Sequence, residues 1–186
     1  RWGPRACRVI GTELPSQQRA AEDEYIRMLE SLENQLLATR YAQGDRPSAV
    51  DAILLGGLRA QTLADPIPDL SRFKKILVWA KLCEEGWDGD GDWASFPGST
   101  PFANHMIGIA EAEYKPFVLG NARALQSKKK IFDITTYGEK TTYLTRDYPE
   151  RSREMLKRFS YTVLTSAELA IADRWLVETK LMELFD

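Results

Sequence analysis

The chain has 186 residues, which is enough for one domain with a hydrophobic core or for one domain with an appendage. Lysine and arginine total 25 against 27 aspartates and glutamates, and the net charge of -2 excludes the broad positive surface of a nucleic-acid-binding protein. No apolar run approaches the ~20 residues of a membrane-spanning helix. The two cysteines, Cys7 and Cys83, form neither a disulfide framework nor a zinc motif. We therefore expect a cytoplasmic protein that binds neither nucleic acid nor membranes. The first residue is Arg1 rather than methionine, which is compatible with a piece of a longer polypeptide.

Two helices are predicted in the first third of the chain. Residues 15 to 40 predict a long amphipathic helix, because Pro15 and Ser16 form a start signal and apolar residues then recur at helical spacing. Residues 48 to 64 predict a short helix that is hydrophobic on almost every side, which is typical of a buried helix. Glycine inside a helix costs about 1 kcal/mol relative to alanine. We therefore expect Gly56 and Gly57 to be core spacers, against which a neighbouring backbone packs closely.

A glycine-rich acidic stretch, EEGWDGDGDWASF, raises the question of a metal site because Asp88, Asp90 and Asp92 alternate with glycines. A calcium loop needs glycine at its sixth position and a bidentate glutamate at its twelfth. Counted from Asp88, those positions hold Trp93 and Ser99. The stretch therefore predicts a solvated, flexible loop and no metal site, and a calcium-regulated helical protein is an alternative that rests on this loop alone.

Further helices are predicted over residues 69 to 85 and 101 to 130, and Pro116 should kink or divide the second of them. The apolar face of the second helix carries Met106, Ala110, Tyr114, Phe117 and Asn121.

The periodicity then changes. Residues 130 to 145 are rich in isoleucine, threonine and tyrosine and predict a small β-hairpin that turns at Tyr137-Gly138-Glu139. A helix should follow from Asp147, with Glu150 completing its start signal, and a last helix should open with a capping box between Thr165 and Glu168. The apolar face expected on the first of these two helices includes Met155, Leu156, Phe159 and Val163. The fold class is therefore all-α with one minor hairpin.

The most informative local pattern is Ser48-Ala49-Val50-Asp51. The Ser48 hydroxyl can accept a hydrogen bond from the backbone N–H of Asp51, while the Asp51 carboxylate reaches back to the N–H of Ser48. A Ser/Asp pair without a nearby base is a poor nucleophile. We therefore interpret Ser48 and Asp51 as a structural N-cap box.

The remaining reactive or aromatic side chains have structural interpretations. His105 is the only histidine and has no cysteine or second histidine close by, which favours a surface or capping role. Cys83 is expected in the core and Cys7 as a plain free thiol. Trp79 and Trp175 are expected to anchor the core.

The stretch LENQLLATRYAQGDRPSAVDAILLGGL, followed by a helix with Phe73, Ile76 and Trp79, resembles the all-helical C-terminal domain of the cytosolic glutathione S-transferase superfamily. In that family a Ser/Thr-x-x-Asp box opens the central buried helix, and Ser48 and Asp51 match it. The resemblance covers about residues 10 to 85. Further on, YKPFVLGNARAL, the hairpin and YPERSREMLKRFSYTVL are similar, more loosely, to the extended tail of some bacterial transferase-like proteins.

The resemblance implies a helical bundle of the glutathione S-transferase C-terminal type, as a single domain over residues 1 to 186. Its core would span residues 10 to 128, and the hairpin and a C-terminal helical extension would span 129 to 186. Family members also have an N-terminal thioredoxin-like domain, which holds glutathione and supplies a tyrosine, serine or cysteine that activates the thiol. No segment of these 186 residues resembles it. We therefore expect no catalytic residue and no cofactor in this chain, with glutathione only the co-substrate of a parent protein.

The leading hypothesis is that the chain is the helical, hydrophobic-substrate half of a glutathione S-transferase-like protein, whose parent would transfer glutathione to a small apolar electrophile. Trp2 and Tyr114 are candidates to line the substrate pocket if the family geometry carries over, and a homodimer is a further possible assembly. The alternative is a non-catalytic, transferase-like protein-interaction module. Coding sequence upstream of Arg1 would discriminate between the two hypotheses.

Overall fold

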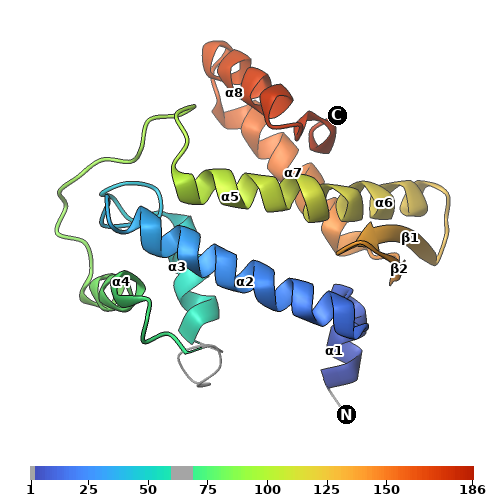
Figure 1. Ribbon diagram of the computed structural model, residues 1–186. Coiled ribbons are helices and arrows are strands. Elements are labelled where there is room, and N and C mark those ends of the chain that lie inside the picture. The colour runs from blue at the N-terminus through green and yellow to red at the C-terminus, as the bar shows by residue number, and fades with distance from the viewer. Residues whose placement is uncertain (1–2, 60–68) are drawn as a thin grey trace. The chain divides into compact units, whose positions relative to one another are not determined.

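The computed structural model describes the backbone of residues 3–59 and 69–186, and the side chains of residues 6–59 and 69–186. This part of the chain is mostly helical with one small antiparallel hairpin, which confirms the predicted mixture of elements (Figure 1). Trp2 and the end of the helix predicted over residues 48 to 64 lie outside the described residues. The chain divides into two compact units. The hairpin unit comprises Arg1–Glu22 and Ile107–Asp186, and the capping-box unit comprises Asp23–Met106.

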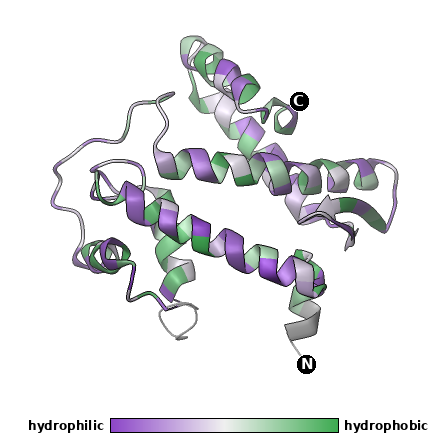
Figure 2. Ribbon diagram, viewed as in Figure 1, coloured by the Kyte–Doolittle hydropathy of each residue, from purple (hydrophilic) through white to green (hydrophobic). Residues whose placement is uncertain are grey.

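The core of the capping-box unit is built on α2 (Pro15–Gln35) and α4 (Lys74–Glu85). Figure 2 shows hydrophobic and hydrophilic residues alternating along α2, the pattern of an amphipathic helix. Leu29 and Leu32 of α2 are fully buried, and Trp79 of α4 is 2% exposed, so Trp79 is the core anchor that the sequence predicts. Other buried members of this cluster are Leu36, Tyr41, Leu58, Leu70, Phe73, Ile76 and Phe102.

The helix α3 (Ala49–Gly57) differs from its prediction. We expected a buried helix, but in its described part Ile53 is 75% exposed, and Asp51 is the buried residue. A nine-residue helix that packs on α4 presents one face to it, so apolar residues on the other faces stay in solvent. Gly56 and Gly57 are also exposed, and among the described residues no atom outside their own helical turn lies within 4 Å of a Cβ built on either. The prediction that they are core spacers is therefore wrong.

The start of α4 is capped by a side chain from α2. The carboxylate of Glu33 accepts hydrogen bonds from the backbone N–H groups of Lys75 and Ile76, at 2.9 Å each. These are two of the N–H groups that the first turn of a helix leaves without an intrahelical partner. The N-cap residue itself, Phe73, is apolar and makes no side-chain cap. A carboxylate distant in sequence therefore fixes where α4 begins.

Pro116 divides its helix through a π-helical turn. The order along the chain is α5 (Pro101–Ile109), the π-helix η2 (Ala110–Tyr114) and α6 (Lys115–Gln126). The N–H of Lys115 bonds to the carbonyl of Ala110, five residues earlier. Proline has no N–H to donate and clashes with the preceding turn, so a wider turn just before it is a natural accommodation.

The hairpin consists of β1 (Ile131–Thr136) and β2 (Glu139–Leu144), paired antiparallel with Ile131 opposite Leu144 and Thr136 opposite Glu139. Tyr137 and Gly138 form the two-residue turn with φ of 50° and 78°, and positive φ at both positions is the signature of a type I′ hairpin turn.

The hairpin packs beside α6 (Figure 1). Gly120 permits this contact, since a Cβ there would lie 2.9 Å from the ring of Phe132.

The C-terminal part of the hairpin unit contains α7 (Asp147–Val163), α8 (Ser166–Glu178) and the 3-10 turn η3 (Met182–Leu184). The Thr165–Glu168 capping box opens α8. In α7 no residue is buried, and Met155, Phe159 and Val163 of its apolar face are 57% to 70% exposed.

The start of α7 also differs from its prediction. Asp147 is already helical, and Glu150 pairs with Arg153 at 2.8 Å rather than capping the helix. Trp175 of α8 is half-buried and packs against the cluster of Val118, Leu176, Leu181 and Leu184.

Candidate functional site

A groove of about 570 Å³ lies wholly within the hairpin unit. It is bordered by the end of α1 (Gly3–Ile10), the π-helical turn, the hairpin and the start of α7. Its apolar and aromatic lining is formed by Val9, Ile10, Ile109, Tyr114, Phe117, Tyr137, Tyr143, Tyr148 and Pro149. Its other lining side chains are Glu113, Thr136, Arg146 and Ser152. The volume and the apolar lining are those of a site for a small organic molecule.

Three packed rings support the groove. Phe117 of α6 stands edge-on to Tyr143 with ring centroids 5.1 Å apart, and Phe132 stacks on Tyr143 at 5.7 Å. Such edge-to-face and offset contacts are favoured geometries for aromatic pairs. The Tyr143 hydroxyl shares a 3.0 Å hydrogen bond with the Thr136 hydroxyl, and burial raises the pKa of Tyr143 above its usual value. Tyr143 is therefore neutral at physiological pH and serves as a rigid wall.

Hydrogen bonds fix the N-terminal segment against the hairpin. Gln17 donates to the Thr141 hydroxyl at 2.6 Å, and Ser16 donates to Glu139 at 3.0 Å. Gly11 sits where the chain passes Tyr143, with φ of +73°, and a Cβ at this position would overlap the Tyr143 hydroxyl at 1.8 Å. Only glycine satisfies both the conformation and the close approach. The wall of the groove formed by the end of α1 therefore has a defined position.

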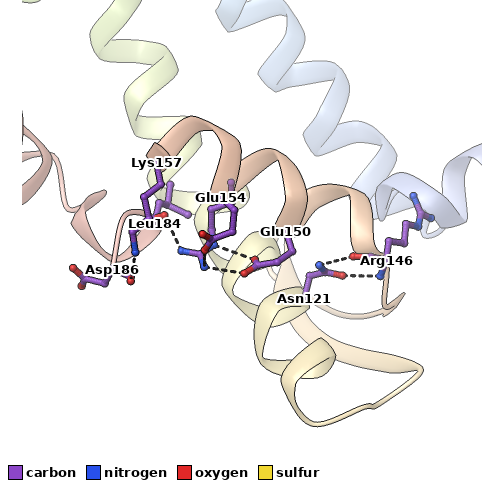
Figure 3. Close-up of polar contacts among 8 residues, drawn as sticks. Asn121, Arg146, Glu150, Glu154, Lys157, Leu184 and Asp186 are labelled. Carbon is purple, nitrogen blue, oxygen red and sulfur yellow. Dashed lines mark hydrogen bonds and ion pairs between the residues drawn. The ribbon is translucent and has the colours of Figure 1, made fainter. Parts of the chain in front are cut away.

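The start of α7 is clamped by one buried amide (Figure 3). Asn121 of α6 is fully buried, and its side chain bonds both main-chain groups of Arg146. The Arg146 N–H donates to Asn121 Oδ1 at 2.8 Å, and Asn121 Nδ2 donates to the Arg146 carbonyl at 2.8 Å. Figure 3 shows the Arg146 side chain extending away from this amide. The clamp engages only main-chain atoms of Arg146, a residue that lines the groove.

The second charged group of the groove is Glu113. Its two carboxylate oxygens each lie 3.4 Å from the backbone nitrogen of Tyr137, whose N–H they accept. Glu113 is thus directed to the turn of the hairpin.

Of the two predicted pocket residues, Tyr114 lines the groove and is 49% exposed, whereas Trp2 lies outside the described residues. Ser48 and Asp51 belong to the capping-box unit and do not line the groove.

The carboxylate of Asp51 is 2% exposed and collects four hydrogen bonds of 2.9 Å each. The donors are the backbone N–H of Ala42, the backbone N–H and hydroxyl of Ser48, and the indole Nε1 of Trp79. The Ser48 hydroxyl accepts in turn from Val50, and the reciprocal capping box is present. The Asp51 carboxylate therefore links the start of α3 to the main chain at Ala42 and to Trp79 of α4, which is a structural role.

The acidic loop has fixed partners, which differs from the flexible loop that we predicted. Asp88 accepts from Arg40 Nη1 at 2.9 Å, and the N–H of Asp45 donates to the carbonyl of Asp92 at 2.8 Å. Arg46 stacks on the rings of both Trp87 and Trp93, 4.8 and 4.2 Å from their centroids. Among the residues that the structure describes, no cluster of three or more histidine, cysteine and acidic side chains is arranged to hold a metal ion.

His105 lies in the interior of α5 and does not cap it. It is half-buried, and within the described part of the chain its Nε2 is buried without a hydrogen-bond partner. Cys83 packs against the core as predicted, and burial raises the pKa of its thiol to about 11. Neither side chain lies in the groove.

Sequence reasoning missed Arg146 and the role of Asn121. The available signal was Asn121 itself, a strongly polar side chain on a predicted apolar helix face, which requires a hydrogen-bonding partner when buried.

Searches of family models, curated proteins and solved structures found no match to this chain. In the part of the chain that the structure describes, no helix combines the length and apolar character needed to cross a membrane.

Proposed function

We propose that this chain is the helical, hydrophobic-substrate half of a glutathione S-transferase-like protein, and that its groove holds the apolar electrophile. The observation that carries the proposal is the groove itself, with apolar and aromatic side chains on most of its lining. In the parent protein, a separate domain would activate the glutathione thiolate, and this half would position the electrophile beside it.

The Ser48–Asp51 capping box also supports the proposal. It has the residues and reciprocal hydrogen bonds that the resemblance implies for the helix after the loop at residues 41 to 47.

The proposal is tested by binding. N-phenyl-1-naphthylamine, a neutral dye whose fluorescence rises in apolar sites, should bind the full chain saturably and be displaced by chlorodinitrobenzene. Tyr114→Ala should weaken the dye by about fivefold, the order expected for one aromatic contact. Tyr161→Ala is the matched control, because Tyr161 is 52% exposed and does not line the groove. Equal affinities in the two variants, or no saturable binding, would contradict the proposal. The chain alone should conjugate glutathione only at the uncatalysed rate.

A second candidate, a protein-interaction module, is favoured by the exposed apolar face of α7. Met155, Phe159 and Val163 recur at helical spacing with 57% to 70% exposure, and exposed apolar patches of this kind mark interaction surfaces. This candidate predicts concentration-dependent self-association in sedimentation velocity, reduced by Phe159→Lys. An unchanged monomer over the accessible concentration range would argue against it.

A further inference from the structure

We propose that the ligand of the groove carries a carboxylate on an aromatic body, and that Arg146 is the residue that binds this carboxylate. The inference rests on the proposed function, since it specifies the substrate class of the same groove.

A second groove of about 540 Å³ also includes Arg146 in its lining, together with Arg8, Glu13 and Lys140. Three of these four charges are already paired: Arg8 pairs with Glu13 at 2.8 Å, and Lys140 pairs with Asp133 at 3.0 Å. For Arg146, no carboxylate among the described residues comes within the 4.0 Å of an ion pair. Its guanidinium is therefore a half-buried cation without an acidic partner in the described chain.

The position of this cation is set in advance. Asn121 holds the N–H and carbonyl of Arg146 with two bonds of 2.8 Å, and the main chain then enters α7. A side chain that extends from a fixed backbone loses less freedom when it binds a ligand than one on a mobile loop. Arg146 is thus preorganised as an anchor.

The chemistry of the anchor selects a carboxylate. A guanidinium keeps its charge at all physiological pH values, and its planar fork matches the two oxygens of a carboxylate. A phosphate would bring up to two negative charges to a groove that offers this single arginine and already contains the Glu113 carboxylate. The remaining walls, including Ile109, Tyr114 and Tyr148, suit a flat apolar body. The ligand class is therefore a monoanionic aromatic acid.

The test uses two probes that differ only in charge, 1-naphthaleneacetic acid and its neutral amide, with calorimetry on the full chain. Wild type should bind the acid about tenfold more tightly than the amide, as expected for one charge-assisted bidentate contact. Arg146→Gln should abolish the preference, chiefly by weakening the binding of the acid. Arg151→Gln is the matched control, since Arg151 is an exposed arginine of α7 outside this groove. The Asn121 side chain bonds main-chain atoms of Arg146, which the substitution does not change. The Arg146→Gln variant should therefore have the melting temperature of the wild type.

A measurement on wild type keeps the test independent of the variant. Raising the salt from about 20 mM to about 500 mM should reduce the preference for the acid, because salt screens a charge pair that is still partly exposed to solvent, and should leave amide binding unchanged. Equal affinity for acid and amide in wild type, or a preference that survives Arg146→Gln, would overturn this inference while leaving an apolar groove in place. Failure of both probes to bind would overturn the proposed function as well.

Discussion

Replacing Asp51 by alanine should destabilise the capping-box unit strongly. Its carboxylate is the common acceptor for Ala42, Ser48 and Trp79, and two of these donors, the Ala42 N–H and the Trp79 indole, are buried. An unpaired buried donor costs about 1–3 kcal/mol, and a lost N-cap costs about 1 kcal/mol. For two such donors and the cap the sum is about 3–7 kcal/mol. At roughly 2–4 °C per kcal/mol, the melting temperature should fall by about 6–28 °C.

The assays are thermal unfolding and urea unfolding, each followed by circular dichroism at 222 nm. Asp51→Asn keeps one side-chain oxygen as an acceptor but places an amide group among the donors, so its loss should lie between wild type and alanine. Asp92→Ala is the matched control, because Asp92 is exposed and its contact to Asp45 uses its main-chain carbonyl. Its effect should stay within about 0.5 kcal/mol. If the midpoints of Asp51→Ala and Asp92→Ala coincide within error, the structural role of Asp51 is refuted.

Three other predictions concern Cys83, Glu168 and the acidic loop. In a Cys7→Ser variant, the rate of alkylation of Cys83 should rise about tenfold per pH unit from pH 7 to 10, because burial raises the pKa of this thiol to about 11. A rate that reached a plateau near pH 9 would contradict this prediction. The pKa of Glu168 is lowered by the hydrogen bonds that its carboxylate accepts from the backbone N–H and the hydroxyl of Thr165. The ionised carboxylate therefore stabilises the fold at pH values above its ordinary pKa, and this stabilisation is lost as the pH falls through the lowered pKa. NMR titration should find the Glu168 pKa raised part of the way back in Thr165→Ala, and an unchanged value would argue against the hydroxyl's contribution. Calorimetry with calcium should detect no site with a dissociation constant below the millimolar range, because the acidic loop lacks the turn glycine and the bidentate acid of a calcium loop. Asp88 is also already paired with an arginine. A dissociation constant in the micromolar range would reverse this interpretation.

Local patterns in the sequence predicted the elements well. The hairpin over residues 130 to 145 was predictable because strand composition and the Tyr137-Gly138 turn lie within one short stretch. The Ser48–Asp51 box was predictable for the same reason, since its partners are three residues apart. Both features depend on neighbours along the chain and on little else.

Features that depend on distant partners were not predictable. The helix α3 has the composition of a buried helix, and yet Ile53 is exposed. Hydrophobic composition alone does not determine how many other elements pack against a helix. The acidic loop reads as flexible, because its partner Arg40 lies 48 residues from Asp88. The groove was not predictable either. Its lining comes from the end of α1, the π-helical turn, the hairpin and α7, and no spacing in the sequence relates Arg146 to Tyr114.

The amide of Asn121 joins α6 to a residue 25 positions later, and the intervening chain makes the whole hairpin. Both hydrogen bonds between the Asn121 side chain and the main chain of Arg146 must break before the start of α7 can separate from α6. We therefore expect α6, the hairpin and the first turn of α7 to open as one cooperative unit in native-state hydrogen exchange. The Arg146 amide should exchange at the slow rate of the α6 interior, although it lies at a helix terminus, where amides ordinarily exchange quickly.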